Sequence, residues 1–209
     1  MLHKKIYIFG YSGHSYVVLD SIIESKFKPS GYFDFQKATY NPYELDYMGF
    51  EKDSDLKKLI QTSYVFPTVG NNKIRKELVE TFEKLDLKQT RIIDPSSNLS
   101  KKIEIGLSTY IGKNVVSNPL TVIEKGVIIN TGSLIGHECN VREFAQIASG
   151  VVLAGNVTVG ENSFIGSNSV VRQGIVIGKN SIVGAGAVVV KDVPENTTVV
   201  GNPAKPLIK

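Results

Sequence analysis

The sequence predicts two domains of different fold class, an α/β domain over residues 1–94 and an all-β domain over residues 95–209 that is mostly a parallel β-helix. Two observations support this division. Strand-like and helix-like segments alternate in the first part, whereas aliphatic residues recur at every sixth position in the second. A length of 209 residues is enough for two small domains that each bury a core.

The N-terminal part alternates short apolar strand patterns with helix patterns, as expected for a small α/β domain with a parallel sheet. Lys5 to Phe9 should form the first strand, and Ser15 to Ser25 a helix with apolar positions at Val17, Val18, Ile22 and Ile23. The later elements are expected at 31–35 (strand), 63–69 (strand), 73–85 (helix) and 91–93 (strand). This succession is a short Rossmann-like pattern.

The C-terminal part contains a six-residue repeat that continues without an insertion. Fifteen of its sixteen positions are aliphatic: Leu99, Ile105, Ile111, Ser117, Ile123, Ile129, Ile135, Val141, Ile147, Leu153, Val159, Ile165, Val171, Ile177, Val183 and Val189. A small or branched residue usually stands four residues after each of them, such as Val115, Cys139 or Ala145. Short parallel strands joined by tight turns, with two inward positions per repeat, have this period. Three repeats make one triangular coil, so the run predicts roughly five coils. A chance apolar rhythm in a β-sandwich is the alternative.

Composition and charge limit the possible partners. The net charge of +4 comes from 24 basic and 20 acidic residues without a dense basic run, so we expect no nucleic-acid binding, although anionic small ligands are compatible with it. No apolar stretch approaches the roughly 18 residues of a membrane span, so no membrane association is expected. The N-terminus lacks a signal-peptide core, and the single cysteine, Cys139, cannot form an internal disulfide. These features predict a cytoplasmic protein.

Histidine is the side chain whose pKa lies closest to neutral pH, which makes histidines the candidate general bases. The chain has three, His3, His14 and His137, and His3 precedes the first strand as a terminal residue. His137 stands two positions after the inward Ile135, so its side chain should leave the β-helix, and the adjacent Glu138 is placed to orient the imidazole. The alternative is an exposed histidine beside a surface acid. Only His137 occurs within the repeats, which argues against a zinc site of three histidines.

The repeats and the segment around His137 resemble a known enzyme family. Ile-Gly-x-x-x-x repeats and the tail from Val200 to Lys205 are similar to the left-handed parallel β-helix of the hexapeptide-repeat acyltransferases, which are usually homotrimers. Asn130 to Glu138 resembles the Asn-Thr-x-x-x-x-x-His-Glu motif of sialic-acid O-acetyltransferase-like enzymes, whose best-known members N-acetylate UDP-4-amino-4,6-dideoxy sugars. The resemblance implies that His137 is the base, that Glu138 supports it, and that Asn130 contacts the substrate or the thioester.

The resemblance also implies acetyl-CoA as co-substrate and no metal. Gln146 stands where the UDP-sugar enzymes have a second histidine, and we expect it to hydrogen-bond a thioester or pantetheine oxygen. Gly155 lies eighteen residues after His137, hence one coil above it, and a second column of small residues holds Ser149, Ser167 and Ala185. Gly155, Ser167 and Ala185 are therefore predicted to contact the coenzyme. The alternative is that β-helix turns simply favour small residues.

The N-terminal domain contains three further stretches that resemble the same family. The glycine-rich turn with Ser12, Gly13 and His14 precedes a helix, whose free N–H groups favour a pyrophosphate. Asp34 matches an acid that contacts the base or ribose, although Phe35 replaces the usual second aspartate and leaves the base unidentified. The stretch from Gly70 and Asn71 to Arg75 follows the third strand. Gly70 and Asn71 are predicted to bind substrate, whereas Arg75 has an ordinary helix-surface position as its alternative.

Together these features predict an acetyl-CoA-dependent N-acetyltransferase acting on the amine of a nucleotide-linked 4-amino-4,6-dideoxy sugar, in bacterial surface-glycan or glycoprotein sugar biosynthesis. The N-terminal domain would hold the nucleotide sugar, and the β-helix would hold acetyl-CoA in a groove between subunits of a homotrimer. Two alternatives remain open at this point. One is a sugar O-acetyltransferase with the same fold and base, and the other is a non-catalytic trimer that binds sugar nucleotides.

Overall fold

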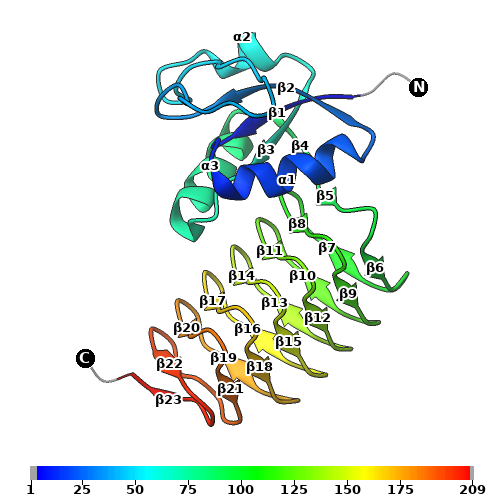
Figure 1. The fold of residues 1–209 in the computed structure, drawn as a ribbon, viewed down its shortest axis with the longest axis vertical. Helices are drawn as coiled ribbons and strands as arrows, with labels where there is room; N and C mark the ends of the chain where they lie inside the picture. The colour runs from blue at the N-terminus through cyan, green and yellow to red at the C-terminus, as the bar shows by residue number, and fades with distance from the viewer. Residues whose placement is uncertain (1–3, 208–209) are drawn as a thin grey trace. The chain divides into compact units, whose positions relative to one another are not determined.

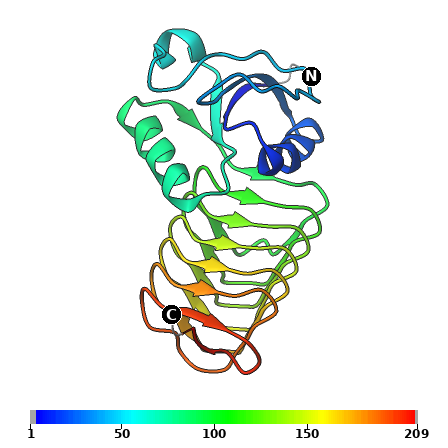
Figure 2. The same ribbon diagram turned by 60° about the vertical axis from the view of Figure 1, so that its left-hand side comes forward.

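The computed structural model describes residues 4–207, so that His3 lies outside the described residues. The chain divides into two compact units, Met1–Pro95 and Ser96–Lys209. Figures 1 and 2 show an α/β arrangement in the first unit and stacked coils in the second. None of the helices within residues 4–207 combines the length and the apolar character that a membrane crossing requires.

The first unit is built on a parallel sheet. Its strands are β1 (Lys4–Phe9), β2 (Phe27–Phe33), β3 (Tyr64–Pro67) and β4 (Lys88–Gln89), in the order β2-β1-β3-β4. The order reverses between β1 and β3, because β2 lies on one side of β1 and the later strands lie on the other. Ligands of open α/β sheets bind outside the carboxyl ends of the strands at such a switch point.

Three helices accompany this sheet: α1 (Gly13–Ile23), α2 (Leu56–Ile60) and α3 (Asn72–Lys84). The Asn71 side chain accepts a hydrogen bond from the backbone N–H of Ile74 at 3.1 Å and thereby caps α3. The short strand β5 (Ile92–Ile93) ends the unit. The helix α2 was not predicted, since its five residues are too few to show a helical period.

Two expected strands differ from those observed. The second strand begins at Phe27 and not at Gly31, because Pro29 is tolerated in β2, an edge strand whose outer side is bridged only at Tyr32, by Tyr47. The fourth strand of the sheet is Lys88–Gln89, whereas the apolar pair at 92–93 forms the separate β5. Which segment pairs with β3 depends on where the chain returns to the sheet, and the local apolar pattern does not contain that information.

Aromatic residues dominate the core of the first unit. The Phe9 and Phe33 rings stack with their centroids 4.7 Å apart, and Phe82 of α3 meets Phe9 edge-on at 4.6 Å. Leu56 and Ile60 of α2 are buried in the same cluster. These contacts join both helices to β1 and thereby support the ends of the strands from which the functional loops emerge.

The second unit is a parallel β-helix with three faces. The β12 face contains β6, β9, β12, β15, β18 and β21; the β13 face contains β7, β10, β13, β16 and β19; the β11 face contains β8, β11, β14, β17, β20 and β22, with β23 antiparallel at its end. The strand bounds are β6 (Asn98–Leu99), β7 (Glu104–Ile105), β8 (Tyr110–Ile111), β9 (Val116–Ser117), β10 (Val122–Ile123), β11 (Ile128–Ile129), β12 (Leu134–Ile135), β13 (Asn140–Val141), β14 (Gln146–Ile147), β15 (Val152–Leu153), β16 (Thr158–Val159), β17 (Phe164–Ile165), β18 (Val170–Val171), β19 (Val176–Ile177), β20 (Ile182–Val183), β21 (Val188–Val189), β22 (Thr198–Val200) and β23 (Lys205–Pro206).

The six-residue repeat determines which side chains enter this helix. Each of its sixteen positions is the second residue of a strand from β6 to β21, and all are buried except Leu99 and Ile105, which are half-buried in the first coil. The small position four residues later is buried as well, as at Val115, Cys139 and Ala145. The two inward positions per repeat therefore lie where the sequence places them.

The turns of the β-helix use left-handed backbone conformations. A residue with φ between +55° and +74° stands three positions after the inward residue of most strands, and asparagine or glycine fills most of these positions. Both residue types tolerate this conformation better than others do. Glu138, with φ +59°, is one of the exceptions.

The β12 face exposes a column of aliphatic side chains. The outward residues of β9 to β21 on this face are Val116, Leu134, Val152, Val170 and Val188. Leu134 is 40% exposed and Val170 39%. The β13 face presents more polar side chains at the equivalent positions, such as Glu104 and Asn140, whereas the β11 face also presents apolar ones, among them Phe164 and Ile182.

Candidate functional site

His137 lies outside the β-helix in the turn that follows β12, and its side chain is 52% exposed. Its Nδ1 is 2.9 Å from the Glu138 Oε2. An ionised carboxylate only accepts hydrogen bonds, so this contact places the ring proton on Nδ1. The Nε2 lone pair then remains available to accept a proton from another molecule.

Glu138 holds this position in a left-handed backbone conformation. Its φ is +59°, in a class of turn positions that asparagine and glycine otherwise favour. A residue without those advantages costs roughly 1 kcal/mol or more there. Its backbone N–H donates to the Pro119 carbonyl of the coil below at 3.0 Å, which keeps the turn in register. The conformation aims the carboxylate at the preceding imidazole.

Gly155 lies against the His137 ring. It follows β15 one coil above, at the same corner, and a Cβ built on Gly155 would overlap the Nε2, Cε1 and Cδ2 atoms of the imidazole. The φ of Gly155 is not in the left-handed region, so the turn itself does not require glycine. The absence of a side chain at this position is therefore needed by the imidazole and not by the backbone.

The other residues predicted in the β-helix lie at a different corner. Asn130, Ser167 and Ala185 follow strands of the β11 face, and Gln146 is the outward residue of β14 on that face. The Asn130 Oδ1 accepts a hydrogen bond from the Thr131 N–H at 2.8 Å. His137, Glu138 and Gly155 stand at the opposite edge of the β12 face. Within one chain the width of that face separates the two groups.

The backbone carbonyl and N–H groups at these two corners differ in whether they are already hydrogen-bonded within the β-helix. The carbonyl groups of Gly155 and Ser167 accept hydrogen bonds from backbone N–H groups of the next coil, from Gly174 at 3.0 Å and from Gly186 at 2.8 Å. The N–H groups of Gly155, Ser167 and Ala185 donate to no other backbone group within residues 4–207. Donors, more than acceptors, are therefore the backbone groups that these columns offer to a ligand.

The glycine-rich turn after β1 ends at the first residues of α1. Ser12 is the N-cap residue without a side-chain capping bond, and a Cβ on Gly13 would meet nothing within 4 Å. Burial, together with the charge of Arg75, lowers the pKa of His14 to about 4. At neutral pH this turn therefore offers backbone N–H groups and a neutral imidazole to a ligand.

The turn after β3 is held by a buried arginine. Arg75 is fully buried, which contradicts the alternative that it is an ordinary surface residue of the helix. Its guanidinium donates to the carbonyls of Val69 at 3.2 Å and Gly70 at 3.0 Å and to the Asn72 side chain at 2.8 Å. Arg75 thus fixes the backbone around Gly70, while the Asn71 amide oxygen is used as the helix cap.

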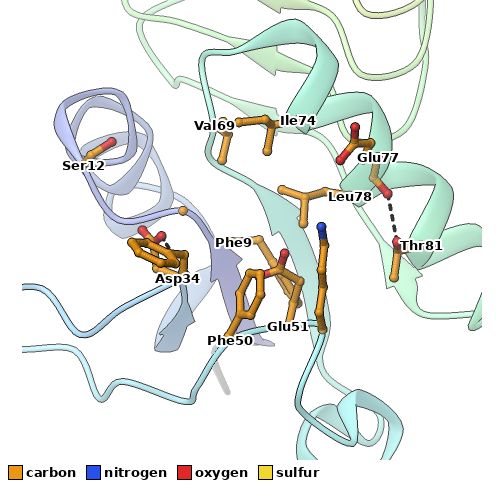
Figure 3. A pocket seen from close by; sticks show the side chains of 13 residues that line it. Phe9, Ser12, Asp34, Phe50, Glu51, Val69, Ile74, Glu77, Leu78 and Thr81 are labelled. Atoms are coloured by element: carbon orange, nitrogen blue, oxygen red, sulfur yellow. Dashed lines mark hydrogen bonds between the residues drawn. The ribbon is translucent and has the colours of Figure 1, made fainter.

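A cavity of about 400 Å³ opens at the switch point of the sheet. Ser12 and Asp34 are the predicted residues that line it, whereas Gly13, His14, Gly70 and Asn71 do not. The Asp34 carboxylate accepts hydrogen bonds from the backbone N–H groups of Tyr11 and Phe35, both at 2.7 Å. In Figure 3, Phe50 and Glu51 form one wall, and Ile74 and Leu78 of α3 form the opposite one.

Sequence reasoning missed several residues of this cavity. Phe50, Glu51 and Lys52 come from the irregular segment between β2 and α2, and Glu77 and Thr81 come from α3. The segment has neither a strand nor a helix period, so nothing in it marked a wall of a site. The outward positions of the helix after the third strand were a usable signal, because they follow the carboxyl end of a parallel strand.

No group of three or more histidine, cysteine, aspartate or glutamate side chains in the described part of the chain is arranged to hold a metal ion.

Family models match three stretches. The PglD N-terminal domain matches residues 5–82, the bacterial transferase hexapeptide (six repeats) matches 138–173, and the hexapeptide repeat of succinyl-transferase matches 156–191.

Solved structures agree with these matches. Perosamine N-acetyltransferase from Caulobacter crescentus, a mutant in complex with CoA and GDP-perosamine, is 28% identical, with a TM-score of 0.93 over 98% of this chain and 97% of that one. The acetyltransferase domain of PglB from Neisseria gonorrhoeae is 31% identical, with a TM-score of 0.86 over 98% and 100%. WeeI from Acinetobacter baumannii is 25% identical, with a TM-score of 0.80 over 97% and 99%.

These similarities confirm the predicted fold class, a Rossmann-like α/β unit followed by a left-handed parallel β-helix. They span nearly the whole chain, and they include both the N-terminal domain and the repeats. The chain therefore belongs to the hexapeptide-repeat acyltransferase family, among the PglB- and PglD-like acetyltransferases that combine a PglD N-terminal domain with a β-helix.

Proposed function

We propose that this protein is an acetyl-CoA-dependent N-acetyltransferase that acts on the amine of a nucleotide-linked 4-amino-4,6-dideoxy sugar. The observation that supports it most is the exposed His137, whose Nδ1 is held by Glu138 while Nε2 lies free beside Gly155. Similar proteins support the same class, since one was solved with CoA and GDP-perosamine and another with acetyl coenzyme A.

In the proposed reaction His137 acts as a general base. The sugar nitrogen attacks the thioester carbonyl carbon, and a new N–C bond forms while Nε2 accepts the proton that the nitrogen loses. The C–S bond then breaks, and the imidazolium returns the proton to the leaving thiolate. Glu138 stabilises the transient imidazolium through Nδ1. No acyl-enzyme forms in this reaction, because the sugar nitrogen attacks the thioester directly.

The backbone N–H of Gly155 is a suitable donor for the oxyanion of this reaction. It stands next to the imidazole and donates to no other backbone group within residues 4–207. Donors of this kind stabilise developing negative charge by roughly 3 kcal/mol. The remaining columns at Ser167 and Ala185 offer further N–H groups to the amide-rich pantetheine arm of the coenzyme.

The two domains divide the substrates between them in this proposal. The domain at 1–94 binds the nucleotide sugar through the turn at Ser12 to His14, Asp34 and the turn at Gly70 and Asn71. The domain at 95–209 binds acetyl-CoA. The single cysteine, Cys139, is buried in the β-helix, which is compatible with a reducing cytoplasm as the site of action.

We further infer a homotrimer. The aliphatic column of the β12 face, with Leu134 40% exposed, supplies an apolar surface that a second copy of the chain would cover. One chain holds Asn130 and His137 at opposite edges of that face. Packing copies on the β12 face would bring Asn130 and Gln146 of one chain toward His137 of the next, and thereby complete the coenzyme groove.

The test measures free thiol released from acetyl-CoA with a panel of nucleotide-linked 4-amino sugars and their hydroxyl analogues. The His137→Ala variant should lose turnover by about 10²- to 10⁴-fold and keep its affinity for acetyl-CoA in calorimetry. Lys179→Ala is a matched control, because Lys179 is exposed at the same turn position on another corner. It should retain full activity.

Three results would each contradict part of the proposal. Full activity of His137→Ala would remove the general base. Faster transfer to the hydroxyl analogues than to the amines would identify a sugar O-acetyltransferase. An absence of thiol release with every sugar, despite tight nucleotide-sugar binding, would indicate a non-catalytic binding protein.

A further inference from the structure

The cavity at the switch point of the sheet has two chemically different ends. Gly10 and Ser12 lie at the end next to the N-terminus of α1, where phosphate groups are favoured. The irregular segment after β2 supplies the other end with Phe35, Phe50 and Glu51. The volume of the whole cavity, about 400 Å³, is within the range of small-molecule sites.

Two phenylalanines form an aromatic surface at this second end. Phe35 is 70% exposed and lies on the rim of the cavity, so its ring is accessible to a ligand. The Phe35 and Phe50 rings meet at 89° with their centroids 6.4 Å apart. A planar base can stack on one ring and contact the edge of the other. Such stacking contributes roughly 1–3 kcal/mol per base.

Glu51 and Lys52 add a polar pattern beside the aromatic rings. Figure 3 shows Glu51 next to Phe50 and facing the cavity. Burial, and to a lesser degree the Asp34 charge, raises the pKa of Glu51, which indicates a carboxylate partly withdrawn from water. The Lys52 ammonium lies 5.8 Å from the centroid of the Phe50 ring and also lines the cavity. Glu51 thus presents two adjacent acceptor oxygens, and Lys52 presents a donor.

Only one common base matches this pattern on its Watson–Crick edge. Guanine places an acceptor, O6, beside two adjacent donors, N1–H and N2–H. Uracil and thymine place a single N–H between two carbonyl oxygens, and one of these would oppose the carboxylate. Adenine and cytosine each present a single donor group there. A carboxylate accepts in pairs from adjacent donors, and lysine is a frequent partner of guanine O6.

We propose that this cavity selects a guanine nucleotide: Glu51 accepts from N1–H and N2–H, Lys52 donates to O6, and Phe35 stacks on the base. The proposal rests on the proposed function, because it names the base of the nucleotide-linked sugar. Asp34, fixed by its two backbone hydrogen bonds, then lies between the base and the phosphate end, where a carboxylate can accept from a ribose hydroxyl.

Calorimetric titration of the full chain with GDP, IDP, ADP, CDP, UDP and dTDP tests the assignment. IDP lacks only the N2 amine of guanine. We expect GDP to bind about tenfold or more tightly than each of the others. The Glu51→Gln variant replaces one acceptor by an amide N–H and should weaken GDP by about 10- to 100-fold. It should also bring the ratio of GDP to IDP affinity close to one, which a merely structural effect of the substitution would not do.

Glu80→Gln is the matched control, because Glu80 is an exposed residue of α3 that does not line the cavity and the change removes the same charge. It should leave all six affinities within about threefold. Lys52→Met should weaken GDP and IDP equally, since both bases carry O6, and should leave ADP unchanged.

Binding of UDP or dTDP as tightly as GDP, or an equal loss for all nucleotides in Glu51→Gln, would overturn the proposal. Acetyl transfer to a UDP- or dTDP-linked amino sugar without GDP binding would overturn it and leave the proposed function intact. GDP binding with the expected pattern but without acetyl transfer to any amino sugar would support this assignment and refute the proposed function. Failure of every nucleotide to bind would refute both.

Discussion

Replacement of Gly155 by alanine tests whether this glycine positions the His137 imidazole. A Cβ at residue 155 would overlap three atoms of the ring, including the Nε2 that is proposed to accept the proton. The His137 side chain is 52% exposed, so the ring can move into solvent. A new rotamer costs roughly 1 kcal/mol, and we therefore expect only a small loss of stability.

The rate should suffer far more than the fold. A displacement of the base by about 1 Å can cost about 100-fold in turnover, which corresponds to roughly 2.7 kcal/mol of activation free energy. We expect kcat of Gly155→Ala to fall by about this factor, with KM for acetyl-CoA changed by less than about threefold. Steady-state measurement of thiol release provides both constants, and thermal unfolding provides the change in stability.

A double-mutant cycle separates positioning of the ring from direct contact with the coenzyme. If Gly155 acts through the imidazole, Gly155→Ala should have almost no further effect in a His137→Ala background. A loss of the same size in both backgrounds would refute the positioning argument. It would instead support the role predicted from the sequence, in which Gly155 contacts the coenzyme.

Three other perturbations follow from buried or apolar groups. Arg75→Met should lower the free energy of unfolding in urea by about 1–3 kcal/mol for each carbonyl around Gly70 that loses its buried donor, and a total loss below about 1 kcal/mol would contradict this. Burial lowers the pKa of His14 from 6.5 to about 4, so the unfolded chain binds this proton first as the pH falls. Stability should therefore be complete above pH 6.5 and decrease toward pH 4 by at most about 3 kcal/mol, and the decrease should be smaller in His14→Gln. Leu134→Asp on the β12 face should reduce the molar mass in light scattering to that of one chain, whereas Val176→Asp on the β13 face should not; equal masses for both variants would exclude the β12 face as the interface.

The surroundings of the candidate general base, His137, show which features of the site can be predicted from local sequence. Counting from Ile135 places His137 outside the β-helix, and the step of eighteen residues places Gly155 above it. The Nδ1 contact with Glu138 and the overlap of a Cβ with the ring required coordinates, because both depend on side-chain rotamers and on the left-handed turn. The burial of Arg75 was likewise invisible in a helix pattern that exposes most of its charged residues.

Several residues that line the cavity of the N-terminal domain, in contrast, could not be predicted from local sequence. Phe50, Glu51 and Lys52 stand 16 to 18 residues after Asp34 in a segment without a period, so no spacing connects them to a site. Their place beside Asp34 results from the strand order β2-β1-β3-β4, which brings the carboxyl ends of β1, β2 and β3 to one edge of the sheet. Pro29 had also hidden the true start of β2.

The sequence by itself determined the architecture of the β-helix and the identity of its inward residues, because each coil repeats the same local requirement for an aliphatic side chain at every sixth position. Only the tertiary structure decided which residues line the cavity of the first unit, how β4 pairs, and that the predicted coenzyme residues occupy two corners of the β12 face. Those outcomes depend on contacts between segments far apart in the chain, and such contacts leave no period in the sequence.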